Sequence, residues 1–234
     1  MPIDSLEAVD GQLMDGLEFC RAAYDLLESI RAEPEGIAEL QAGRSRRAKK
    51  LLEEILPLAA FIQARYGPGS RMQVRWSSGN QPYDAQAVYR GALVDRGFLP
   101  ADQYLEVTTA EHVNEYLVRE RMAKEGGSFA AAGTRRDLTT REVLSVPVAV
   151  EHSDEMDRLV ALVIERVREK AAHGYPATTA LVVYCNLGGV ILADEWSHIV
   201  AAVQHALEPD AVPFTEVALV HHANGVARVG GRAS

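Results

Sequence analysis

The chain has 234 residues, of which 47% are hydrophobic, and its 24 basic and 33 acidic residues give a formal net charge of −9. This length and apolar content suffice for one core of substantial size, with or without a small appendage. The negative balance argues against a protein whose whole surface binds nucleic acid, although it is compatible with a local basic groove.

Cysteines and apolar runs narrow the class further. Cys20 and Cys185 are the only cysteines and lie far apart, so neither a disulfide framework nor a cysteine zinc site is expected. The N-terminus lacks a basic segment followed by an apolar one, and no apolar run approaches the roughly 20 residues that cross a bilayer. We therefore expect a cytoplasmic protein with no membrane partner.

Helices are predicted where apolar residues recur at steps of three and four. Gly67-Pro68 is expected to end the third of them, and Asp194 is expected to cap the last. In chain order the predicted helices are residues 4–31, 35–41, 43–66, 110–124, 156–173 and 195–207.

Strands are predicted where apolar residues alternate or form short continuous runs, namely residues 72–76, 84–89, 104–109, 179–185 and 214–221. Residues 125–140 are rich in Gly and Ala and predict a mobile loop or loose hairpin. Residues 143–150 predict an edge strand, because Pro147 interrupts them. The order of elements predicts an α/β protein with a central mixed β-sheet flanked by helices, in which a helical extension (1–43) precedes the α/β domain (44–225).

Two of the predicted strands each carry one acidic residue among apolar neighbours, Asp84 and Glu106. A carboxylate in a half-buried strand is costly unless it has a partner. A shared divalent cation would explain both residues, since carboxylate oxygens bind magnesium. Two simpler interpretations also fit: Asp84 closes a turn, and Glu106 pairs with an arginine across the sheet.

The arrangement of these acids resembles the PD-(D/E)XK superfamily, whose members have the restriction-endonuclease-like fold. The motifs that carry the resemblance are Pro82-Tyr83-Asp84 and Glu106-Val107-Thr108, with Glu53 or Glu54 at the position of the helical glutamate. The run from Arg166 through Lys170 and Tyr175 to Tyr184, an amphipathic helix with a basic end and then a buried strand, is similar to the back half of that fold. The resemblance spans roughly residues 45–190.

The resemblance implies a restriction-endonuclease-like core that hydrolyses phosphodiester bonds of DNA or RNA with Mg²⁺ or Mn²⁺. It implies Asp84, Glu106 and the backbone carbonyl of Val107 as metal ligands, and Asp84, Glu106, Thr108 and Glu53 as catalytic residues. The sequence leaves open whether Glu53 or Glu54 faces the site.

Thr108 departs from the family pattern, because a lysine usually follows the glutamate by two residues. A threonine hydroxyl holds a water molecule but supplies no positive charge. Arg119, Lys124 or Lys49 are candidates to supply that charge from elsewhere. The alternative is a catalytically inactive fold that acts as a binding or interaction module.

The predicted helix 43–66 begins with a basic cluster formed by Arg44, Arg46, Arg47, Lys49 and Lys50. We name Arg44, Arg46, Arg47 and Lys49 as candidate contacts to nucleic-acid phosphates, against the alternative of a solvated helix face. A second copy of the chain is a further candidate partner.

Histidines add little to the candidate site. His112 follows Glu106 closely enough to approach the same site, although a partly exposed helical position explains it equally well. His221 and His222 are adjacent on a predicted strand, so their side chains are expected on opposite faces.

Overall fold

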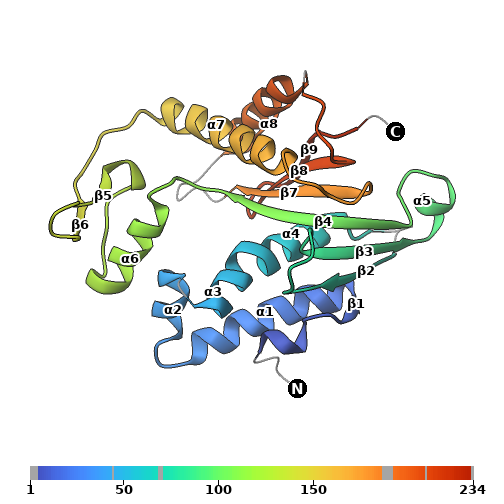
Figure 1. The fold of residues 1–234 in the computed structure, drawn as a ribbon, viewed down its shortest axis with the longest axis horizontal. Coiled ribbons are helices and arrows are strands. Elements are labelled where there is room, and N and C mark those ends of the chain that lie inside the picture. The colour runs from blue at the N-terminus through green and yellow to red at the C-terminus, as the bar shows by residue number, and fades with distance from the viewer. Residues whose placement is uncertain (1–4, 44, 68–70, 186–191, 209, 233–234) are drawn as a thin grey trace.

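A seven-stranded mixed sheet forms the centre of the molecule (Figure 1), which confirms the predicted α/β class. Its order is β1-β2-β3-β4-β7-β8-β9; neighbours are antiparallel except β4–β7 and β7–β8, which are parallel. The strands are β1 (Leu13–Asp15), β2 (Arg71–Trp76), β3 (Ala85–Arg90), β4 (Asp102–Ala110), β7 (Thr179–Cys185), β8 (Glu216–His221) and β9 (Gly225–Gly230). This computed structural model describes residues 5–43, 45–67, 71–185, 192–208 and 210–232.

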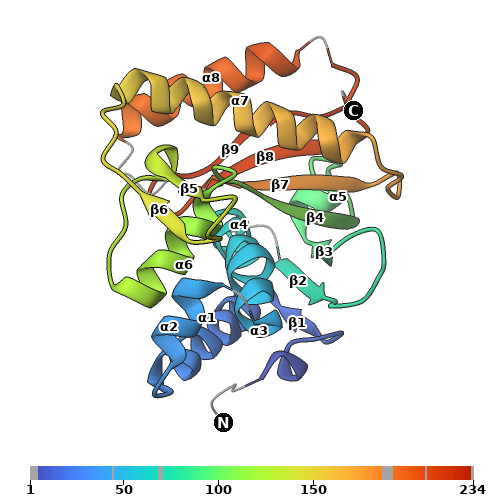
Figure 2. The same ribbon diagram turned by 60° about the vertical axis from the view of Figure 1, so that its left-hand side comes forward.

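Helices cover the two faces of the sheet in different places (Figure 2). α1 (Gly16–Ala32) and α4 (Leu56–Arg65) pack on one face, where Phe19, Leu26, Phe61 and Ile62 join the apolar side of β2, β3 and β4 in one core. α7 (His152–Ala171) and α8 (Ala193–Leu207) pack on the other face, against a second core centred on β7 and β8. None of the helices in the described part of the chain is long and apolar enough to cross a membrane.

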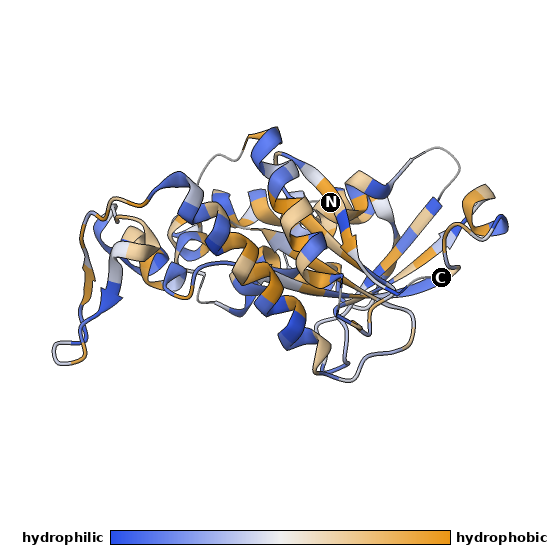
Figure 3. Cartoon of the chain, turned by 90° about the horizontal axis from the view of Figure 1, so that it is seen from above, coloured by the Kyte–Doolittle hydropathy of each residue, from blue (hydrophilic) through white to orange (hydrophobic). Residues whose placement is uncertain are grey.

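Side-chain periodicity explains why these segments form these elements. Met72, Val74 and Trp76 of β2 are buried while the residues between them are more exposed, as expected for a strand with one covered face. β8 is buried along its whole length because helices cover one face and α4 approaches the other. The helices show apolar and polar residues on opposite sides (Figure 3).

The N-terminal segment differs from the expected helical extension. The predicted helix 4–31 is a short 3₁₀ turn, then β1, and only then α1. β1 pairs with β2, and α1 packs in the main core with Phe19, Cys20, Ala23, Leu26 and Ile30 buried. β1 and α1 are therefore part of the central sheet and its core. The periodicity of α1 predicts a helix that extends too far towards the N-terminus, because β1 has only three residues.

A π-helical turn lies in the middle of the next helix. α2 (Gly36–Ala42) precedes α3 (Arg46–Lys50), and the chain continues without a break through the turn Leu51–Ile55 into α4. Pro57 has no N–H to donate to the carbonyl of Glu53 four residues earlier. The wider turn accommodates this missing hydrogen bond, and it sets the directions of Glu53 and Glu54.

A separate arm projects from the sheet at the left of Figure 1. It contains α6 (Glu115–Glu125) and a two-stranded sheet of β5 (Thr134–Arg136) and β6 (Val143–Ser145). Three predictions are corrected here. The helix expected over 110–124 begins at Glu115, the loop 125–140 contains β5, and the strand expected over 143–150 is the short β6, outside the central sheet.

The remaining differences are at strand and helix ends. β8 begins at Glu216 rather than at Phe214, and a ninth strand, β9, follows it through a turn. α8 begins at Ala193, so Asp194 lies inside the helix and is not its cap. The side chain of Glu195 instead accepts the backbone N–H of Leu192 at 2.8 Å. A four-residue helix, α5 (Ala92–Asp95), connects β3 to β4.

Candidate functional site

Asp84 and Glu106 lie near the same end of the β3–β4 pair. The regular register ends where Ala85 faces Leu105, and the backbone N–H of Asp84, the residue before β3, also donates to the carbonyl of Leu105 at 2.9 Å. The negative charge of Glu106 is close enough to Asp84 to raise its pKa. The Asp84 carboxylate accepts the backbone N–H of Val107 at 2.8 Å, in the place where β3 would otherwise continue.

The carboxylate of Glu106 is buried and paired. Its side chain is 9% exposed, and Oε1 accepts a hydrogen bond from Nζ of Lys170, near the end of α7, at 2.5 Å. The hydroxyl of Tyr175, just after α7, also hydrogen-bonds Glu106. Burial, and then the charge and hydrogen bond of Glu106, raise the pKa of Tyr175, so this tyrosine is a donor to the carboxylate.

Glu54, rather than Glu53, lies beside this pair. Its carboxylate accepts the indole N–H of Trp76 at 3.2 Å and pairs with Lys50 at 2.5 Å. Glu53 instead lies near Glu111, Lys49 and Arg119. Burial, followed by Glu111, raises the pKa of Glu53. The π-helical turn thus directs the two neighbouring glutamates to different surroundings.

The pKa of Asp84 records how much negative charge gathers here. Burial, then the nearby charges of Glu54 and Glu106, raise this pKa from 3.8 to about 7, and the Val107 N–H and Lys50 oppose the rise. A carboxylate surrounded in this way holds a proton near neutral pH or takes a cation as its counter-charge. An excess of carboxylate at one end of a sheet is an environment that suits a divalent ion.

The ion site has two candidate carboxylates and one carbonyl rather than a closed cage. Within the described part of the chain, no three His, Cys, Asp or Glu side chains are grouped closely enough to hold a metal ion. Asp84 accepts the N–H of Val107, the residue that follows Glu106, so the two carboxylates belong to neighbouring positions of the pair. Magnesium is often held by one or two carboxylates, with water and substrate oxygens completing its shell, so the residues present fit such an ion.

The lysine beside Glu106 is Lys170, which comes from another element than β4. Thr108 shares the face of Glu106 in β4, whereas Lys170 reaches the same carboxylate from α7. None of the three residues proposed from the sequence takes this position among the described contacts; Arg119, for example, makes a bidentate pair with Glu111 at 2.7 and 3.0 Å. One signal was available: α7 crosses between the parallel strands β4 and β7, so its last turn must return close to β4.

The candidate phosphate contacts at the start of α3 are only partly free. Arg47 binds Glu33 at 2.7 and 2.8 Å and also Glu39 at 2.6 Å, so its guanidinium is already occupied. Arg46 is exposed and approaches Ser78 at 3.4 Å, in the loop that leads to Asp84. Lys49 is exposed, and Arg44 lies outside the described residues.

Histidines lie apart from the carboxylates. Nδ1 of His112 accepts the backbone N–H of Asn114 at 3.0 Å ahead of α6, and burial lowers the pKa of this ring. β8 ends at His221, so the rings of His221 and His222 pack at 4.6 Å instead of pointing to opposite faces. The ring of His221 also packs on Trp196.

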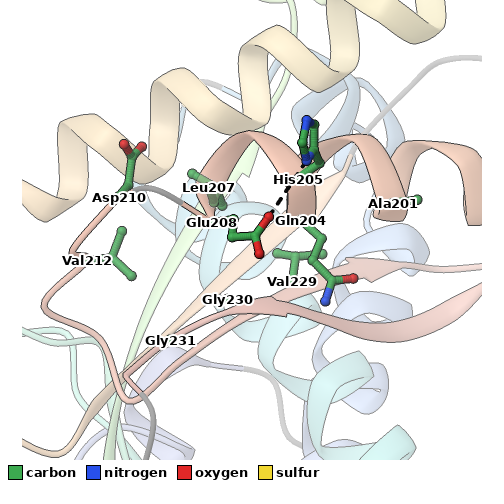
Figure 4. A pocket seen from close by; sticks show the side chains of 10 residues that line it. All are labelled: Ala201, Gln204, His205, Leu207, Glu208, Asp210, Val212, Val229, Gly230 and Gly231. Carbon is green, nitrogen blue, oxygen red and sulfur yellow. Dashed lines mark ion pairs between the residues drawn. The ribbon is translucent and has the colours of Figure 1, made fainter.

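An open pocket of about 470 Å³ lies beside the C-terminal end of α8 and β9 (Figure 4). His205 and Glu208 approach each other there at 3.7 Å, both largely exposed, and the other lining side chains are mostly small or apolar. None of the residues around Asp84 and Glu106 lines it. The pocket lacks convergent buried polar groups, so we place the candidate chemistry at the carboxylates.

Comparison with protein-family models, curated proteins and solved structures gives no match to this chain. Any assignment of function therefore depends on the geometry and charge of the site itself.

Proposed function

We propose that the chain is a metal-dependent phosphodiesterase of the nuclease type, as its resemblance to the PD-(D/E)XK superfamily implies. The observation that carries the proposal is that Asp84 lies close to Glu106 at the end of the β3–β4 pair, with the Nζ of Lys170 at 2.5 Å from Glu106. The family pattern has a lysine two residues after the glutamate, and this chain has Thr108 at that position. In this proposal Lys170 of α7 supplies the positive charge instead.

In this proposal, Asp84, Glu106 and the carbonyl of Val107 hold a Mg²⁺ or Mn²⁺ ion. Such an ion supplies charge neutralisation for the scissile phosphate and activation of water. Glu54 adds negative charge close to Asp84. Lys170 is the positive group aimed at the reacting phosphate, and Tyr175 holds the Glu106 carboxylate in place. Arg46, exposed beside the loop before Asp84, is a contact for a neighbouring phosphate.

The alternative is a binding module without catalytic activity. The observation that favours it is the ion pair itself, because Lys170 already neutralises the 9% exposed carboxylate of Glu106. In the enzyme, this pair must loosen when an ion arrives. In the binding module it is permanent, and Glu106 and Lys170 contribute to structure alone.

Metal titration separates these two functions. Mg²⁺ and Mn²⁺ are titrated calorimetrically into the wild type, Asp84→Ala and the matched pair Glu54→Gln and Glu53→Gln. We expect binding in the wild type, none in Asp84→Ala, and weaker binding in Glu54→Gln only, because Glu53 lies in other surroundings. No heat from the wild type at up to about millimolar metal would sink the enzyme proposal, since cellular Mg²⁺ sites are filled in that range.

A lysine swap then tests catalysis. Cleavage of a labelled oligonucleotide should fall about 10²-fold or more in Lys170→Ala, the loss typical of a charge that stabilises a transition state. Adding Thr108→Lys in that background should recover part of the rate, since position 108 shares the face of Glu106. Unchanged cleavage in Lys170→Ala would remove the lysine from the mechanism.

A further inference from the structure

The half of the sheet face beside the carboxylates is not covered by any described helix. α7 and α8 lie over β4, β7, β8 and β9, and β1, β2 and β3 extend beyond them (Figures 1 and 2). The residues of β2 and β3 on this face are exposed or half-buried, whereas their neighbours Met72, Val74 and Ala87 on the opposite face are fully buried. On one face, the part of the sheet formed by β2 and β3 is therefore uncovered, and this uncovered surface lies next to the candidate site.

The strand register arranges this surface in rows that start at the site. Asp84 and Glu106 lie just beyond the Ala85–Leu105 pair, at which the register ends. The next row on the face that carries Glu106, about 7 Å away, is Arg75–Gln86–Tyr104. Beyond it follow Gln73–Val88–Asp102 and then Arg71–Arg90. We use the name open platform for this face of β2 and β3, which carries Arg71, Arg75 and Arg90, together with Tyr83 and Tyr104.

The arginines of the open platform are without counter-charges in the described part of the chain. Arg71, Arg75 and Arg90 are exposed, and none of their guanidinium groups makes an ion pair or hydrogen bond within the described residues. Arg71 and Arg90 are direct cross-strand partners, an arrangement that like charges disfavour. Two acids lie in the outer rows, Asp102 and, on β1, Asp15 opposite Gln73; with three arginines these rows still carry a net positive charge although the whole chain is acidic.

Two aromatic rings lie in or beside the row of Arg75, next to the carboxylates. Tyr83 and Tyr104 pack against each other with ring centroids 4.5 Å apart, and both are half-buried. Tyr83 directly precedes Asp84, and Tyr104 lies two residues before Glu106 on the same face of β4. Half-exposed aromatic rings beside unpaired guanidinium groups are the combination that stacks bases and tracks a backbone of phosphates.

We propose that the open platform binds single-stranded nucleic acid and leads the strand to Asp84 and Glu106. Arg75, Arg90 and Arg71 contact successive phosphates, and a base stacks on the Tyr83–Tyr104 pair. A flat sheet with exposed aromatics presents surfaces to splayed bases, whereas a duplex hides its bases from such a surface. The proposal deepens the proposed function, on which its catalytic part rests, by naming the substrate class.

Binding is measured on the full chain in excess chelator, so that no metal-dependent cleavage occurs. The probe is a fluorescein-labelled oligothymidylate of about 15 nucleotides, long enough for one sheet platform, followed by fluorescence anisotropy at several salt concentrations. An oligouridylate of equal length distinguishes RNA from DNA, and a hairpin duplex and inorganic polyphosphate test for strandedness and for bases. The variants are Arg75→Gln/Arg90→Gln and Tyr104→Leu. The matched control is Arg21→Gln/Arg31→Gln, which removes the same charge from exposed positions on α1.

We expect Arg75→Gln/Arg90→Gln to weaken binding and to lower the slope of log affinity against log salt by about 1.4, or about 0.7 for each lost phosphate contact. Tyr104→Leu should weaken binding about 5- to 100-fold without changing that slope, as the loss of one stacked base does. The α1 control should bind like the wild type. The duplex and polyphosphate should bind more weakly than the single strands.

Three results would overturn the platform: wild-type affinity in both platform variants, an equal loss in the α1 control, or tighter binding of the duplex or polyphosphate than of either single strand. The two proposals fail separately. Strand binding that depends on Arg75 and Arg90 without any metal-dependent cleavage refutes the nuclease and leaves the platform. Cleavage by a protein whose platform variants bind normally refutes the platform and leaves the nuclease.

Discussion

Replacing Asp84 by asparagine is the sharpest test of the charge at the site. The Asp84→Asn variant would keep a side-chain oxygen that accepts the Val107 N–H, and would lose the carboxylate that Glu54 and Glu106 repel. In the folded protein Asp84 has a pKa of about 7, against an ordinary value of 3.8. The folded state therefore binds one more proton than the unfolded state between about pH 4 and 7, so stability falls as pH rises through that window and levels off above it.

The magnitude follows from the shift. A rise from 3.8 to about 7 corresponds to about 4 kcal/mol between fully protonated and fully ionised limits. Of this, about 3 kcal/mol develops between pH 5 and pH 8. Near pH 5 the folded wild type keeps the Asp84 proton but the unfolded chain has largely released it, so the Asp84→Asn variant should already be more stable than the wild type by about 1 kcal/mol. At pH 8 the variant should be more stable than the wild type by about 2–3 kcal/mol, since solvent relaxation takes part of the full figure.

Urea unfolding in the presence of chelator, followed by tryptophan fluorescence at pH 5, 6, 7 and 8, measures this gap. Trp76 is fully buried and Trp196 nearly so, so their emission reports global unfolding. Asp102→Asn is the matched control, because Asp102 is exposed at the start of the same strand as Glu106, and its gap should not vary with pH. A gap for Asp84→Asn that is equal at pH 5 and pH 8, or a variant less stable than the wild type at pH 8, would refute the reasoning.

Two further predictions concern a buried charge and a close backbone approach. Lys170→Met should destabilise the fold by about 2–3 kcal/mol, because Glu106 loses its counter-charge, and Glu106→Gln in the same background should recover most of this in a double-mutant cycle; simple additivity would show that the pair is not coupled. Gly36→Ala should cost about 3 kcal/mol in chemical denaturation, since a Cβ there would lie 1.5 Å from the carbonyl oxygen of Ile30. Gly127→Ala, where the Cβ meets open space, should change stability by less than about 0.5 kcal/mol, and equal losses in both would contradict the contact.

The sequence predicts the central sheet well where a strand has one covered face. β2, β3 and β4 alternate cleanly, and the continuous apolar run of β7 indicates a strand covered on both faces. β1 and β9 were missed because each pairs at an edge of the sheet, where three residues or a glycine-flanked run suffice. Edge strands gain their stability from a neighbour that local periodicity does not record.

The residues of the candidate site likewise divide into those that local sequence patterns predict and those that depend on distant packing. The positions of Asp84, just before β3, and of Glu106 in β4 are local properties, and the pairing of these two consecutive strands brings both residues to the same end of the pair. Whether Glu53 or Glu54 faces the site depends on the π-helical turn at Leu51–Ile55. The regular spacing of apolar residues predicts a helix here but does not predict how far this wider turn rotates the two side chains. Lys170 is separated from Glu106 by 64 positions. Only the packing of α7 over β4 and β7 determines that contact.

Charge balance links the two proposals. Asp84, Glu54 and Glu106 gather negative charge near one end of the sheet, and Lys50 and Lys170 are the cations that pair with Glu54 and Glu106. On the face that carries Glu106, about one pleat away, lies Arg75, which has no carboxylate partner within the described residues. If fold stability alone governed this surface, the free arginines and the crowded acids would be expected to pair with each other. Their separation suits a substrate and an ion of opposite charge, because the phosphates of a nucleic acid would neutralise the arginines and a divalent cation would neutralise the carboxylates.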